Sequence, residues 1–125
     1  MDKKLEKQLV EKYPKLYKDY GGNIKETCMG WGFCCEDGWY KLIDELSEKL
    51  EPLDVVATQV KEKFGELRFY FKCDNDNYEK ANEYIDDASN QSYKICEICG
   101  NPGQLRSGGH LQTCCDTCFK KGILY

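Results

Sequence analysis

Apolar residues recur at helical spacing in three stretches of the chain. In the clearest, residues 38–50, apolar positions follow Trp39 after three, four, seven and eleven residues. That spacing places one apolar stripe along a helix, so we expect a core helix there. A second helix is predicted over residues 3–13, and it should end at Pro14 because proline breaks a helix. The third is predicted over residues 78–89.

Two segments between the predicted helices at residues 38–50 and 78–89 alternate apolar and polar residues, as strands do. They are residues 55–63 and 67–73, and the connection Phe64-Gly65-Glu66 between them contains a glycine. Two such runs joined by a short link predict an antiparallel hairpin. Asp37 is expected to be the N-cap of the helix at residues 38–50, because its carboxylate can accept a hydrogen bond from a free backbone N–H of the first turn.

Four cysteines near the C-terminal end have the spacing of a structural zinc site. Cys96 and Cys99 form one C-x-x-C pair, Cys115 and Cys118 form another, and 15 residues separate the pairs. Zn²⁺ binds four thiolates as a tetrahedron in such sites, which leaves no open position. We therefore predict one structural zinc per chain, held by these four residues. Cys114 is the alternative to Cys115, because it lies within chelating distance of Cys118 in the sequence.

The remaining cysteines are expected to be reduced thiols. The chain has nine cysteines, an odd number, and its first residues are charged and do not resemble an export signal. We therefore expect a reducing, cytoplasmic compartment, where paired cysteines bind metal rather than form disulfides. Cys28, Cys34, Cys35 and Cys73 are interpreted as buried thiols, with a second metal site as the alternative. His110 is predicted to be a hairpin residue with no special role.

The predicted order of elements is helix, helix, strand, strand, helix and metal unit, which is typical of the α+β class. We expect a small antiparallel sheet, the β-hairpin, packed on helices and followed by a C-terminal zinc-ribbon or zinc-knuckle unit. Residues 1–94 would form the body and residues 95–125 the zinc-binding unit. So short a unit buries too little apolar surface to be stable alone, so it should pack on the body within a single folding domain.

Composition and charge argue against two classes of protein. No apolar run approaches the ~18 residues that a membrane-spanning helix needs, so no membrane association is expected. The formal net charge is −4 and the pI is about 5.1, whereas a protein that binds nucleic-acid phosphates usually carries a basic face. Six acids and one lysine lie between Asp74 and Asn90, so the excess of acid is local.

Arginine occurs only at positions 68 and 106, each time in the context Gly-x-Leu-Arg, against 16 lysines. A guanidinium group binds carboxylates and phosphates in a bidentate geometry that lysine cannot provide. We therefore predict an anion-binding or partner-binding surface on which tryptophans serve as stacking platforms. Its predicted residues are Lys61, Lys63, Arg68, Arg106, Trp31 and Trp39. One alternative is a solvated strand face. Another is that both arginines pair with acids of residues 74–87 and stabilise the packing.

Four stretches of the chain also carry a family resemblance. They read ETCMGWGF (26–33), DGWYKLID (37–44), QVKEKFGELRFY (59–70) and CEICGNPGQLR followed by the second cysteine pair (96–118). In these motifs and their order the chain resembles small, mostly uncharacterised proteins of tailed phages and prophages. Gly30 stands where that family commonly has a cysteine, and Cys118 where a histidine also occurs. The resemblance implies a phage-type protein that acts inside a host cell.

We therefore expect a non-enzymatic, zinc-containing binding protein with a role in counter-defence. Its partner would be a host defence protein or a small anionic, nucleotide-like ligand. The alternative function is a nucleic-acid-binding accessory or regulatory factor that uses the zinc ribbon, which the acidic pI disfavours. An enzyme is not expected, because the sequence contains no P-loop, nucleophile elbow or H-E-x-x-H motif.

Overall fold

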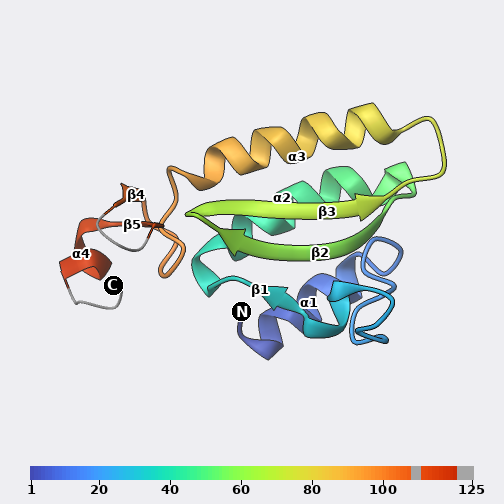
Figure 1. Ribbon diagram of the computed structural model, residues 1–125, viewed down its shortest axis with the longest axis horizontal. Helices are drawn as coiled ribbons and strands as arrows, with labels where there is room; N and C mark the ends of the chain where they lie inside the picture. Colours follow the sequence, from blue (N-terminus) through green and yellow to red (C-terminus); the bar gives the residue numbers. More distant parts are fainter. Residues whose placement is uncertain (108–110, 121–125) are drawn as a thin grey trace.

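The computed structural model describes residues 1–107 and 111–120 of the chain. Its helices are α1 (Lys3–Lys12), α2 (Tyr40–Leu50), α3 (Tyr78–Ser92) and α4 (Asp116–Lys120), with short 3₁₀ turns η1 (Cys28–Trp31), η2 (Asp37–Trp39) and η3 (Glu51–Leu53). Its strands are β1 (Phe33–Cys34), β2 (Val56–Lys63), β3 (Glu66–Lys72), β4 (Gln104–Arg106) and β5 (Gln112–Cys114). The fold is α+β, which confirms the predicted class (Figure 1).

The main sheet has three strands in the order β1-β2-β3. Strands β2 and β3 form the predicted antiparallel hairpin, in which Lys61 lies opposite Arg68. Phe64 and Gly65 at its tip both have positive φ angles, as a two-residue type I′ turn requires. The parallel strand β1 was not predicted, because two residues are too short to show any alternation.

The core lies between α2 and one face of this sheet. The apolar stripe of α2 is buried together with Val60, Leu67 and Phe69 in one cluster, as the helical spacing predicted. Trp39 belongs to this core: it has no exposed surface, and its Nε1 donates to the backbone oxygen of Ile95 at 2.9 Å. It therefore cannot serve as a surface stacking platform, which corrects the prediction.

The start of the core helix also differs from the prediction. Asp37 lies in η2 rather than at the N-cap of α2, and the N-cap residue is Trp39. The Asp37 carboxylate instead accepts a hydrogen bond of 2.7 Å from the backbone N–H of Asp2. The Asp37 carboxylate, which was predicted to cap α2, thus links the residue that precedes α1 to the turn that precedes α2.

The opposite face of the main sheet is open. Cys34, Lys61 and Arg68 lie in one row across its three strands, because Cys34 pairs with Lys61 and Lys61 with Arg68. Neither helix α2 nor α3 crosses this face, which looks toward the viewer in Figure 1. No helix in the described part of the chain is long and apolar enough to cross a membrane.

Candidate metal centre and the open sheet face

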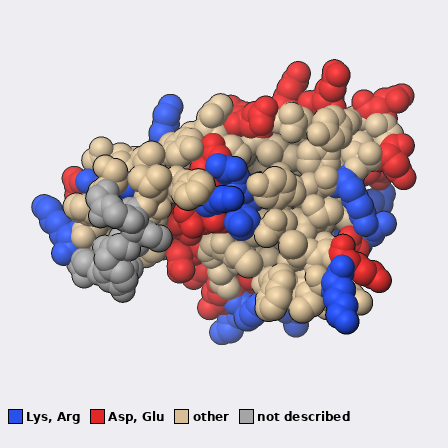
Figure 2. All heavy atoms as spheres, in the orientation of Figure 1, with Lys and Arg blue, Asp and Glu red and all other residues tan. Residues whose placement is uncertain are grey.

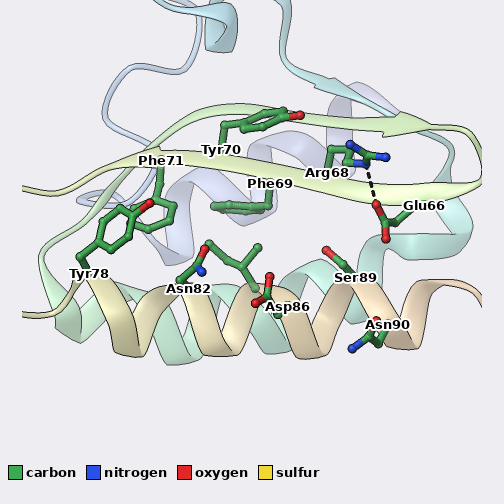
Figure 3. A pocket seen from close by; sticks show the side chains of 11 residues that line it. Glu66, Arg68, Phe69, Tyr70, Phe71, Tyr78, Asn82, Asp86, Ser89 and Asn90 are labelled. Atoms are coloured by element: carbon green, nitrogen blue, oxygen red, sulfur yellow. Dashed lines mark ion pairs between the residues drawn. The ribbon is translucent and has the colours of Figure 1, made fainter.

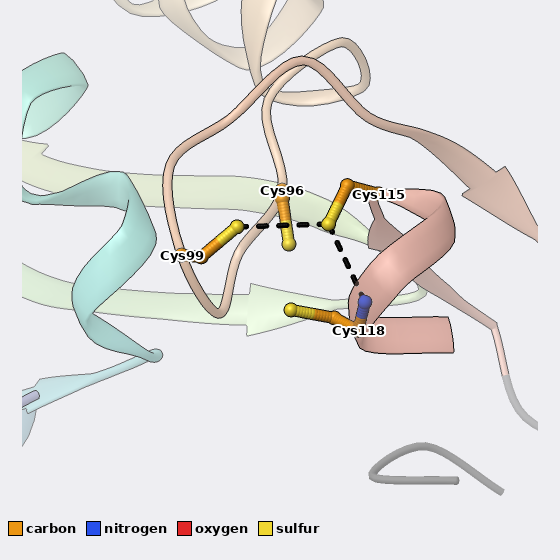
Figure 4. A group of neighbouring side chains, drawn as sticks. All are labelled: Cys96, Cys99, Cys115 and Cys118. Atoms are coloured by element: carbon orange, nitrogen blue, oxygen red, sulfur yellow. Dashed lines mark hydrogen bonds between the residues drawn. The ribbon is translucent and has the colours of Figure 1, made fainter. Parts of the chain in front are cut away.

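The four predicted metal ligands converge on one point. The Sγ atoms of Cys96, Cys99, Cys115 and Cys118 all lie within 4.8 Å of one another (Figure 4). The Sγ atoms of Cys99 and Cys115 are 3.6 Å apart, and a tetrahedral centre with metal–sulfur bonds of ~2.3 Å requires about 3.8 Å. The cluster therefore has the size and the donor set of a four-thiolate metal site.

Two different local structures present the cysteine pairs. In the first pair, Gly100 has a φ of 83° and donates its N–H to the oxygen of Cys96 at 2.9 Å, which turns the chain back toward the metal position. In the second pair, the first turn of α4 brings the N–H of Cys118 to 3.4 Å from Cys115 Sγ. That hydrogen bond lowers the pKa of Cys115 to about 7, which favours the metal-binding thiolate.

The structure decides between the alternatives for the cysteines. Cys114 is fully buried but lies outside the cluster, so Cys115 is the fourth member. Within residues 1–107 and 111–120 this cluster is the one group of possible metal ligands, so Cys28, Cys34, Cys35 and Cys73 form no second site there. Cys35 is buried as predicted, whereas Cys28 and Cys34 are exposed, so the interpretation as buried thiols is wrong for those two. His110 and part of the predicted hairpin turn lie outside the described residues.

The metal unit (residues 95–107 and 111–120) is bonded to the body (residues 1–94) through Glu97, which lies between Cys96 and Cys99 in the sequence. Its side chain is buried and accepts hydrogen bonds of 3.0 Å from the Glu36 N–H and from Gln112 Nε2. Its backbone oxygen accepts from the Gly38 N–H at 2.7 Å. Sequence reasoning missed this residue, because nothing in the sequence distinguishes a buried acid in this loop from a solvated one.

A second contact joins the metal unit to the hairpin. The hydroxyl of Thr113 in β5 donates to the backbone oxygen of Gly65 at 2.7 Å. Gly65 lies close to the Leu105 side chain of β4, and its φ of 82° in the turn is what favours glycine there. The unit thus contacts both η2 and the hairpin tip through hydrogen bonds.

The predicted binding residues do not converge on one point. Lys61 and Arg68 lie side by side on the open face, and the Nε of Arg68 forms an ion pair with Glu66 at 2.6 Å. This Nε is buried and makes no aligned hydrogen bond, so the contact is an ion pair only. Lys63 is exposed two residues along β2 and lies over the Phe64 ring. Trp31 is 63% exposed just before β1.

Arg106 is engaged inside the metal unit instead. Its guanidinium forms a 2.6 Å ion pair with Asp116 and lies 4.6 Å from the centre of the Phe119 ring. It therefore holds β4 against α4, beside the cysteine cluster, and both of these partners belong to the C-terminal unit and not to the open face. The ion-pair partners of the two arginines, Glu66 and Asp116, also lie outside residues 74–87, so the predicted pairing with those acids is wrong.

Comparisons of the chain with protein-family models, with curated proteins and with solved structures find no match.

Proposed function

We propose that this protein is a zinc-stabilised binding protein that recognises a partner protein through the open face of its main sheet. The carrying observation is that Lys61 lies directly opposite Arg68 on that face. Like charges in this position destabilise a sheet, and Glu66 neutralises only one of the two. A carboxylate of a partner would relieve that repulsion. The pair therefore favours binding of an acidic group, although it does not stabilise the fold.

Exposed aromatic residues support a protein partner. Trp31 is 63% exposed and Tyr70, on the same sheet face as Arg68, is 45% exposed. Tryptophan, tyrosine and arginine are enriched at protein interfaces. The resemblance to phage proteins makes a host protein, such as a defence component, the expected partner. Counter-defence is the role that this partner would imply.

An anionic, nucleotide-like molecule is the second candidate ligand. The paired cations Lys61 and Arg68 favour it, because phosphates are bound by such groups. The loss of Trp39 to the core weighs against a small ligand, because it removes one of the two predicted stacking platforms. Nucleic acid is a weaker candidate still, because the net charge is −4 and Arg106 of the metal unit is neutralised by Asp116.

The metal in this proposal is a single structural Zn²⁺. Four thiolates in tetrahedral arrangement suit zinc and fill every coordination position. The zinc would therefore hold the C-terminal unit together and stabilise its contacts with η2 and the hairpin. All nine cysteines are free of disulfides, which supports a reducing, cytoplasmic compartment.

Affinity purification from the native cells, followed by native mass spectrometry, tests this proposal. We expect one zinc per chain and a retained protein partner. The Trp31→Ala/Lys61→Glu variant should keep the zinc and lose the partner. Lys7→Glu, which reverses a charge on an exposed position of α1, should keep both. Equal retention of the partner by the open-face variant and by wild type would refute the proposal, and a bound nucleotide would favour the second candidate.

A further inference from the structure

Helix α3 runs along the free edge of β3 and leaves a groove between them. At one end the helix covers the strand: the Leu67 N–H donates to Ser92 Oγ at 3.0 Å, and Ser89 Oγ donates to the Leu67 oxygen at 2.9 Å. At the other end the rings of Phe71 and Tyr78 lie 5.2 Å apart. The groove between these two contacts has a volume of about 630 Å³ (Figure 3).

The strand edge that lines this groove carries unpaired backbone groups. The N–H and C=O of Leu67 point away from β2, since they bond to serines of α3. Successive residues of a strand alternate in direction, so Phe69 points its N–H and C=O the same way, into the groove. Among the described residues, no hydrogen bond from α3 reaches them. An edge strand with free N–H and C=O groups is a template for pairing with another extended chain.

The charges of the residues in and around the groove favour a basic peptide segment as its ligand. Asp86 lines it from α3 and Glu66 from β3, and Arg68 is the one cation among the residues that line it. Six acids and one lysine lie between Asp74 and Asn90, and Figure 2 shows acidic side chains gathered along the side of the molecule that α3 forms. Since Arg68 is already paired with Glu66, the unpaired acid in the groove is Asp86.

We propose that this groove binds an extended, basic segment of the partner protein. The backbone of the segment pairs with the N–H and C=O of Phe69, and one of its lysines or arginines faces Asp86. The free edge between the two covered ends of the groove, residues 68–70, rises about 7 Å, at ~3.4 Å per residue, so about three residues of the segment pair with it. Alternate apolar side chains of the segment rest on Phe69 and Ile85, which also line the groove.

This inference rests on the proposed function, because it describes the chemistry of the same partner. Arg68 and Tyr70 line the groove, and their side chains also belong to the open sheet face. A partner protein seated on that face can therefore continue into the groove without a gap. The two surfaces have opposite requirements: the open face takes acidic groups of the partner, and the groove takes a basic strand.

Short labelled peptides test the groove directly. The probe is acetyl-Val-Lys-Val-Lys-Val-amide, and the comparison peptides replace both lysines by glutamate or carry N-methyl groups on the central residues. We expect the lysine peptide to bind about tenfold tighter than the glutamate peptide at low ionic strength, and the N-methylated peptide not to bind. The amide of Phe69 should exchange with solvent more slowly when the lysine peptide is bound.

Matched variants separate the groove from its surroundings. Asn82→Trp fills the groove from an exposed position of α3 and should abolish peptide binding, whereas Asp86→Asn should weaken it about threefold. Glu83→Gln makes the same charge change on the same helix outside the groove and should have no effect. Unchanged binding to the Asn82→Trp protein, or unchanged exchange of the Phe69 amide, would overturn the inference.

The open-face variant distinguishes this inference from the proposed function. Trp31→Ala/Lys61→Glu changes no residue that lines the groove and adds negative charge beside Arg68, so it should bind the lysine peptide at least as tightly as wild type does. If that variant loses the partner while wild type fails to bind the peptide, the open face stands and the groove inference is wrong. If the peptide binds in the groove but the open-face variant keeps the partner, the proposed open-face contact is wrong instead.

Discussion

The N–H of Gly38 donates a 2.7 Å hydrogen bond to the backbone oxygen of Glu97, so the turn that starts the core helix is bonded to a residue between two metal ligands. The approach is close enough that a side chain on Gly38 would collide with the backbone of Cys96 and Glu97. The metal unit and the helical body therefore share a tightly packed interface. A side chain added on one side should displace the backbone on the other.

Gly38→Ala tests this interface. The added methyl group has no room beside the Glu97 backbone, so one of the two segments must move. We expect the free energy of unfolding to fall by about 1–3 kcal/mol, as overpacking usually costs, and the zinc to be released more readily to a chelator. Urea unfolding and a chelator titration measure the two effects. Lys41→Ala, at an exposed position nearby, serves as the control, and an equally stable Gly38→Ala protein would show that the interface adapts.

Cys99→Ser should abolish stoichiometric zinc binding. Cys99 is one of the four converging thiols, and three remaining ligands hold zinc much less firmly. Metal analysis of the purified protein gives the zinc content, and amide exchange should become faster in residues 95–107. Cys73→Ser removes a thiol outside the cluster and should keep one zinc per chain. Zinc content unchanged in the Cys99→Ser protein would remove this residue from the site.

Leu46→Ala should destabilise the body by about 2–5 kcal/mol, because it removes a buried side chain from the centre of the apolar stripe of α2. The midpoint of urea unfolding measures the loss. Glu45→Ala, at the neighbouring exposed position, is the control and should leave the free energy of unfolding nearly unaltered. Comparable midpoints for the two variants would mean that this stripe does not carry the core.

Arg68→Ala distinguishes a binding role from a structural one. The ion pair between Arg68 and Glu66 is partly exposed to solvent, so its loss should cost at most about 1 kcal/mol of stability. We expect the variant to keep its fold and zinc and to retain the partner protein less well in affinity purification. A clear drop in melting temperature with unaltered partner retention would assign Arg68 to the packing of the sheet instead.

Alkaline pH should destabilise the protein partly through Tyr13. Burial, followed by the 2.7 Å hydrogen bond to Asp44, raises the pKa of Tyr13 from 10.0 to about 12. Because the folded state holds this proton more tightly, the contribution is fully present below pH 10 and is lost as the pH rises toward 12. Urea unfolding at pH values across this range should show a smaller decline in stability for Tyr13→Phe than for wild type. Equal declines would contradict the assignment.

The sequence by itself determined the elements whose signal lies within a few neighbouring residues. The stripe of α2, the alternation of β2 and β3 and the two C-x-x-C pairs each follow from the geometry of a single segment. Helix, strand and metal knuckle have fixed spacings, so the spacing alone was enough to assign residues such as Leu46, Val60 and Cys99 to their elements. Pro14 ended the first helix for an equally local reason, since α1 stops at Lys12.

Only the tertiary structure decided which distant residues meet. The helical spacing placed Trp39 on the core stripe, but only the tertiary structure brings the backbone oxygen of Ile95 to its Nε1 and excludes the ring from the surface. Arg106 was predicted to join Arg68, yet Asp116 lies nearer and holds it. The groove beside Phe69 likewise exists only because α3, which is distant in the sequence, runs along the edge of β3. These outcomes depend on contacts between segments far apart in the chain, whose geometry no local spacing records.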